Sequence, residues 1–236
     1  MNKNIYKEYA FKYINNGMSV IPDKYQKKLP AIRSWSDYCF RLPTTEEVNT
    51  WSDNFSESNI SLALGEASGV IAIDVDTTNP EILEFLKKEL YPSPVEKVGS
   101  KGMTRFYRYT GEVTEVFKYN GEVVFELLSN KKKTTLPPSL HPNGERYHWS
   151  GKSLLEVNSS DLPALPPYLL GKLMKMIIDA HPCEEVEQSG RGTFHTNGRN
   201  DTLVKMCFSL IGENASVDDA VRKLVEFDKE NHLQRH

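Results

Sequence analysis

The stretch that decides the fold is GVIAIDVDTTNP, residues 69–80, in which two carboxylates follow an apolar run. Residues 70–73 are apolar, and only Val75 separates Asp74 from Asp76. Runs of this kind are typical of buried strands, and buried strands rarely carry acidic residues. Alternate side chains of a strand point to the same face, so we expect Asp74 and Asp76 to point together.

Two neighbouring carboxylates of this kind need compensation. They would lie roughly 6–7 Å apart along the strand and repel each other, so that one would tend to stay protonated. A divalent cation removes the repulsion, and hard oxygen ligands suit Mg²⁺ or Mn²⁺. An acid at a strand end can instead cap the next helix or pair with an arginine. The pattern alone leaves both interpretations open.

A third acid occurs in a second apolar run, EVVFELL at residues 122–128. Glu126 is the only charged residue within residues 123–128, and its strand face is otherwise apolar, so exposure to solvent explains it poorly. Together with Asp74 and Asp76 it would complete a site for two-metal phosphoryl transfer. The alternative is a buried acid that pairs with a lysine or arginine.

The periodicity of the chain predicts an α+β or α/β fold over residues 1–180, followed by a small helical part. Helical periods and caps predict helices within residues 4–16, 43–55, 79–90 and 166–180. Apolar and alternating runs predict strands at residues 18–22, two within 60–76, and others at 95–100, 103–109, 116–119 and 122–128, with Asn120-Gly121 as a hairpin turn. Residues 181–197 are expected to form a linker and residues 198–236 a helical segment.

The composition is that of an ordinary globular protein. Of the 236 residues, 39% are hydrophobic and 26% are charged. No apolar run has transmembrane length, and the first residues lack the apolar core of a signal peptide. The three cysteines are widely spaced and odd in number, which indicates reduced thiols and favours a cytoplasmic protein.

The middle of the chain is the expected place for an anionic partner. Residues 97–152 contain ten basic and five acidic residues, although the whole chain has a net charge of −3. Arg105 shares a strand face with two tyrosines, an arrangement that could hold a triphosphate and stack a base. An amphipathic strand with solvated arginines is the other interpretation.

Two further groups of polar residues have two interpretations each. Ser139 and His141 stand between prolines, where they could contact a phosphate or a sugar, or belong to a turn before an edge strand. Lys131, Lys132 and Lys133 could contact a template backbone or form a solvated hairpin tip.

Four segments, in this order, resemble the archaeo-eukaryotic primase superfamily, specifically the bifunctional primase/polymerase domain of phages, plasmids and mobile elements. KKLPAIRSW (residues 27–35) resembles its early lysine, proline and tryptophan segment, and residues 59–77 resemble its first catalytic motif. Residues 123–149 resemble its acid-bearing strand and the following PPSLHPNG loop, and residues 196–212 resemble the start of its helical C-terminal segment.

The resemblance implies a primase-polymerase core with an RRM-like catalytic sheet over residues 1–180 and a helical primase segment over residues 198–236. It implies that Asp74 and Asp76 match the paired metal-binding acids and that Glu126 matches the third acid, so that the three would hold two Mg²⁺ or Mn²⁺ ions.

The resemblance also indicates where nucleotides and DNA would bind. Family members tend to have a Gly-x-His segment whose histidine contacts the phosphates of the incoming nucleotide, but SKGMTRFYRY, the corresponding stretch here, has no histidine. Lys101 or Arg105 would substitute, with Ser139 and His141 as further candidates. We expect nucleic-acid contacts from a separate set of basic residues: Lys131, Lys132, Lys133 and Arg199.

The function implied is primase and DNA polymerase activity on single-stranded DNA with dNTP or NTP substrates. Since a helicase often follows such domains, the chain is expected to work with one, in the same longer chain or separately, and without a membrane. A metal-dependent nuclease is the first alternative, although Glu126 lacks the lysine two residues on that restriction-type motifs carry. A DxD glycosyltransferase and a non-catalytic replication-initiation module are the others.

Overall fold

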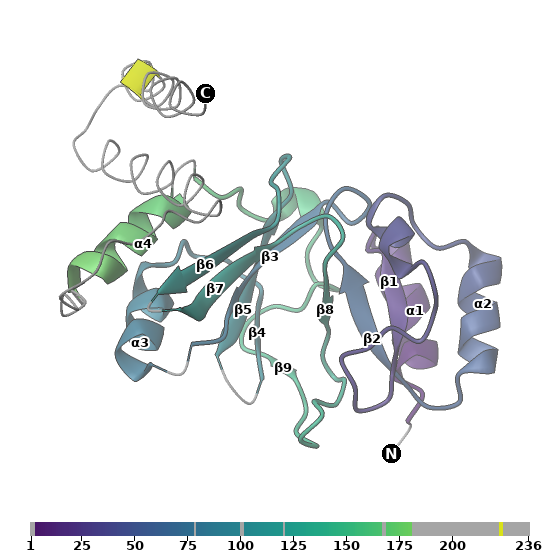
Figure 1. The fold of residues 1–236 in the computed structure, drawn as a ribbon. Helices are drawn as coiled ribbons and strands as arrows, with labels where there is room; N and C mark the ends of the chain where they lie inside the picture. The colour runs from purple at the N-terminus through teal and green to yellow at the C-terminus, as the bar shows by residue number, and fades with distance from the viewer. Residues whose placement is uncertain are drawn as a thin grey trace, which may run out of the picture. The chain divides into compact units, whose positions relative to one another are not determined.

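The structure is a computed structural model that describes residues 3–77, 79–99, 102–119, 121–166, 169–180 and 222–223. It divides the chain into two compact units, Met1–Pro166 and Pro167–His236. The first unit combines helices with two sheets, and every pairing between its named strands is antiparallel (Figure 1). The α+β class expected from the sequence is therefore confirmed.

The larger sheet has six strands in the order β6-β7-β3-β5-β4-β9. Its members are β3 (Val70–Val75), β4 (Glu96–Val98), β5 (Met103–Arg108), β6 (Glu115–Tyr119), β7 (Glu122–Leu128) and β9 (His148–Trp149). The stretch that follows Gly69 forms β3, which is paired on both sides and buried except at Asp74. The two charges thus stand at the end of an interior strand.

The smaller sheet has three strands in the order β1-β2-β8. They are β1 (Val20–Lys24), β2 (Ser58–Ala63) and β8 (Lys133–Thr135). Helix α1 (Ile5–Asn15) packs on β1 and β2, and α2 (Thr45–Asn54) packs on α1. A short helix, η1 (Trp35–Cys39), lies beside β1 and β2.

Strands β2 and β3 follow each other in the chain but belong to different sheets. The turn between them contains Gly65 at φ +103°, where an added Cβ would lie 1.9 Å from Oδ1 of Asn130. Only glycine fits this backbone position and close approach. The two strands and their glycine turn were predicted, whereas the change of sheet was not.

The local signals for helices are confirmed in the structure. Asn4 caps α1 by accepting a hydrogen bond from the Lys7 N–H. Thr44 and Glu47 form a reciprocal capping box at the start of α2. Helix α3 (Pro80–Glu89) begins with proline at its first position and is capped by the side chain of Asn79, which accepts from two backbone N–H groups.

The two faces of β3 have different neighbours. Val70 and Ala72 belong to an apolar core that includes residues of both sheets and of α1. On the opposite face the sheet is tied to α3 by Arg105, which donates hydrogen bonds to the carbonyls of Lys87 and Leu90. Figure 1 shows α3 on the side of the sheet away from α1 and α2. Asp74 lies on the same face of β3 as Ala72 and therefore faces the region between the two sheets.

The second unit contributes one described helix, α4 (Leu169–Ala180), which confirms the helix predicted near its position. Among the described residues, no helix has the length and apolar character needed to cross a membrane. The linker predicted at 181–197 lies outside the described residues, as does the segment at 198–236 apart from Arg222 and Lys223, so the boundary at residue 180 stays a prediction.

Candidate active site

A row of four paired residues crosses adjacent strands of the six-stranded sheet. Glu126 on β7 lies directly opposite Asp74 on β3, and Asp74 lies directly opposite Thr104 on β5. Thr104 in turn lies opposite Lys97 on β4. Residues paired directly across antiparallel strands project from the same face. Two of the three predicted acids, a hydroxyl and a lysine therefore occupy one face of the sheet.

This face opens into a pocket of about 560 Å³ that both sheets line. Asp74 and Asp76 line it from the end of β3, and Thr104 and Lys97 from the neighbouring strands. The surrounding wall is strongly basic, because five lysines line the pocket: Lys28, Lys97, Lys131, Lys132 and Lys133. A pocket with this excess of positive charge favours a polyanionic ligand.

The carboxylates have few partners of their own. Asp74 is half-buried and accepts a hydrogen bond from the Thr104 hydroxyl. Asp76 is exposed, and Glu126 is half-buried and does not line the pocket. None of the three forms an ion pair with another residue in the described part of the chain. Glu96 on β4 differs, since it pairs with Arg105 at 2.6 Å.

The donor set fits a hard divalent cation in kind, because it consists of carboxylate oxygens without cationic partners. The three carboxylates are, however, less closely gathered than the ligands of a bound metal ion. Within the residues that the structure describes, no three His, Cys, Asp or Glu side chains are gathered closely enough to hold a metal ion. Asp74 and Asp76 share the pocket, and Glu126 stands next to Asp74 in the sheet without reaching the pocket.

Lys97 is a site residue that sequence reasoning missed. Its side chain is buried, with 6% of its surface exposed, and its Nζ donates to the Thr134 hydroxyl at 2.7 Å and the Thr135 carbonyl at 3.1 Å. Burial lowers the pKa of Lys97 to about 8, while the nearby Asp74 carboxylate raises it. The only signal in the sequence was a lysine beside apolar residues in a short strand.

The wall of the pocket that faces Lys97 contains a second buried charged group, Asp23. Asp23 of β1 is fully buried, and its Oδ2 accepts from Lys133 Nζ at 2.7 Å and from Ser61 Oγ at 2.5 Å. Its other oxygen has no hydrogen-bond partner among the described residues. The pair fixes Lys133 at the pocket, so this lysine is no solvated hairpin tip. Asp23 had not been identified from the sequence.

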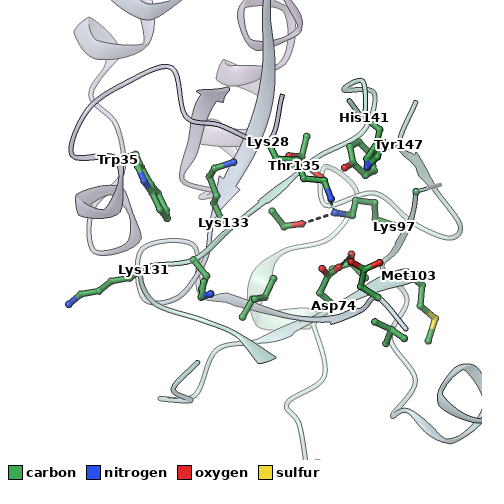
Figure 2. Close-up of a pocket in the computed structure, with 17 residues that line it drawn as sticks. Lys28, Trp35, Asp74, Lys97, Met103, Lys131, Lys133, Thr135, His141 and Tyr147 are labelled. Carbon is green, nitrogen blue, oxygen red and sulfur yellow. Dashed lines mark hydrogen bonds between the residues drawn. The ribbon is translucent and has the colours of Figure 1, made fainter. Parts of the chain in front are cut away.

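Aromatic side chains complete the pocket (Figure 2). The Tyr147 ring lies 4.8 Å from Lys97 Nζ, and His141 meets Tyr147 edge to face at 5.7 Å between ring centroids. Burial raises the pKa of Tyr147. Trp35 lines the pocket together with Lys28, and both come from the segment KKLPAIRSW.

The remaining predicted residues are placed as follows. Arg105 alternates with Thr104 and points to the α3 side, where Glu96 and two carbonyls hold it, so it does not line the pocket. Ser139 is fully buried, and its hydroxyl is bonded to the backbone of Ile60 at 3.0 and 3.3 Å. Lys101 and Arg199 lie outside the described residues.

The family of the chain follows from comparison with known proteins. No curated protein matches the chain significantly. The sequence profile of a family described as bifunctional DNA primase/polymerase, N-terminal (Prim-Pol), matches residues 10–167, which is more than half of the chain and includes the whole pocket lining. The chain therefore belongs to the bifunctional DNA primase/polymerase family.

Proposed function

We propose that this chain makes or extends primers on single-stranded DNA by metal-dependent nucleotidyl transfer. The observation that carries the proposal is the meeting of unpaired carboxylates and lysines in one pocket. Asp74 and Asp76 stand at the end of an interior strand, and five lysines line the same pocket. The family generally uses divalent metals, and Asp74, Asp76 and Glu126 are the residues that would hold two Mg²⁺ or Mn²⁺ ions.

Bound there, such ions supply charge neutralisation at the triphosphate and activation of the attacking hydroxyl. The residues of the chain do the rest. Thr104 donates its hydroxyl hydrogen to Asp74 and so fixes the orientation of that carboxylate. Lys28 and Lys133 place positive charge beside the position that the phosphates would take, and the Trp35 ring offers a surface on which a base can stack.

The basic wall also suggests how DNA would approach. Lys131 and Lys132 precede β8 and line the pocket, and Lys131 is exposed. Lysines of this kind bind phosphate groups as point charges and give affinity without sequence preference. We propose a single-stranded template and dNTP or NTP substrates for the first unit, and a helicase as partner in replication.

A primer-extension assay tests this proposal. The full chain is incubated with a primed single-stranded template, four dNTPs or four NTPs, and Mg²⁺ or Mn²⁺. Extension whose product sequence follows the template supports the proposal. Shortening of the template with no extension would identify a nuclease, and DNA binding with neither reaction would identify a non-catalytic initiation module. Either result contradicts the proposed transfer reaction.

A further inference from the structure

Lys97 is a buried cation with no carboxylate partner. No Asp or Glu lies within ion-pair distance of its Nζ in the described part of the chain, whereas Lys133 on the facing wall has Asp23 at 2.7 Å. Two hydrogen bonds to Thr134 and Thr135 use two of the three ammonium hydrogens. A buried charge is costly unless it is paired.

The groups around Lys97 come from every side of the pocket. Asp74 lies two strands away in the same row and attracts the ammonium, while Lys28 and Lys133 repel it. Tyr147 offers its ring face at 4.8 Å. In Figure 2 the Lys97 side chain lies between Asp74 and Tyr147, and its nitrogen points to the side on which Lys133 lies. Asp74 attracts the ammonium from a distance, but no ion pair cancels the charge of Lys97 in the described part of the chain.

Gly102 directly precedes β5, the strand that pairs with β4, on which Lys97 lies. Gly102 has φ +55°, and an added Cβ would lie 1.7 Å from the Val75 carbonyl oxygen, so no other residue fits there. Taking Gly102 as the glycine of the Gly-x-His segment puts Thr104 at the place of the missing histidine. Lys97 is the residue directly opposite Thr104 on the next strand, on the same face.

We propose that Lys97 binds the triphosphate of the incoming nucleotide and so takes the task that the absent histidine would have. This inference rests on the proposed function, since it names a substrate contact in the same pocket. Lys97 lines the pocket, whereas the hydroxyl of Thr104 already donates its hydrogen to Asp74. A purely structural lysine, one that only joins β4 to β8, is the competing explanation.

The number of phosphates on the ligand separates the two explanations. We would measure the affinity of the full chain for dATP, dAMP and inorganic tripolyphosphate with Mg²⁺ and no template, so that no turnover is needed. Lys97→Met keeps the apolar stem and removes the charge. It is expected to weaken dATP and tripolyphosphate binding roughly 10- to 100-fold, as for a lost charge-assisted hydrogen bond, and to change dAMP binding by less than about threefold.

The matched controls are Lys97→Arg, which should keep most of the affinity for dATP, and Lys88→Met on the exposed surface of α3, which should keep all of it. A folded Lys97→Met variant that binds dATP as tightly as the parent chain overturns the inference. Equal losses for dATP and dAMP overturn it as well, because they indicate a structural role.

If Lys97→Met does not fold, the parent chain provides the test. Bound dATP should slow the reductive methylation of Lys97, followed by mass spectrometry, and leave that of Lys88 unchanged. An unprotected Lys97 contradicts the inference. Failure of the proposed function would be a separate result. If dATP binds through Lys97 but primers are not extended, the proposed transfer reaction is contradicted and the proposed triphosphate site is still supported.

Discussion

Glu126 lies directly opposite Asp74 in the pairing of β7 with β3, although the two residues are far apart in the sequence. Like charges at directly opposed positions destabilise a sheet, and neither carboxylate has an ion-pair partner among the described residues. Conversely, a cation shared by the two would remove the repulsion. This pairing is the structural reason to assign Glu126 a place beside Asp74 and Asp76.

Glu126→Gln is the first prediction. Removing one charge at nearly constant shape is expected to reduce primer extension by roughly 100-fold or more, because a metal ligand and its charge are lost. Glu126→Asp should retain part of the activity. Glu122→Gln, at an exposed position of the same strand, is the matched control and should extend primers at the parent rate. A Glu126→Gln variant with the activity of this control would remove Glu126 from the site.

Thr104→Val is the second prediction. The substitution keeps the shape and removes the hydroxyl that orients Asp74, so we expect roughly a tenfold lower extension rate. The variant should also need a higher Mn²⁺ concentration for half-maximal activity, whereas Thr104→Ser should need the parent concentration. An unchanged metal requirement in Thr104→Val would show that the hydrogen bond does not position the carboxylate.

The third prediction concerns Lys97 and pH. Its pKa is lowered to about 8 in the folded chain, against an ordinary value of 10.5. Between these values Lys97 is protonated in the unfolded chain and largely neutral in the folded chain. Its contribution to the free energy of unfolding therefore increases as pH rises from about 8 to 10.5. The stability of the parent chain should therefore rise relative to that of Lys97→Met over this range in parallel denaturation curves. A constant difference would mean that the amine titrates normally.

The fourth prediction concerns Glu47, which lies outside the pocket. Hydrogen bonds from Arg41 lower the pKa of Glu47 to about 2, so its contribution to stability is complete above pH 4.5 and is lost as pH falls toward 2. Since Arg41 is 48% exposed, solvent screening limits this contribution to about 0.5–1 kcal/mol. Glu47→Gln should remove this pH dependence in urea denaturation, and an unaltered acid profile would contradict it.

Local signals predicted most of the elements. Thr44 and Asn79 cap helices where the sequence indicated, and the apolar run after Gly69 forms a buried strand. Caps and periodicity act over a few residues, so a single sequence carries them. The sheet to which a strand belongs depends on distant pairing, which explains why the separation of β2 from β3 was not foreseen.

The site was predicted in part for the same physical reason. Alternation places Arg105 and Thr104 on opposite faces of β5, but it does not tell which face a helix covers. Helix α3 covers the face of Arg105, and the pocket lies on the face of Thr104. Lys97 and Asp23 gain their importance from burial against other strands, which local sequence does not display.

The central claim is that Asp74 and Asp76 bind the ions that drive nucleotidyl transfer. The most direct measurement is the rate of primer extension by Asp74→Asn and Asp76→Asn, with Asp53→Asn on the exposed surface of α2 as the matched control. We predict that both pocket variants keep the melting temperature of the parent chain and lose extension at least roughly 100-fold, while the control extends normally. Extension at the parent rate by either pocket variant would contradict the account.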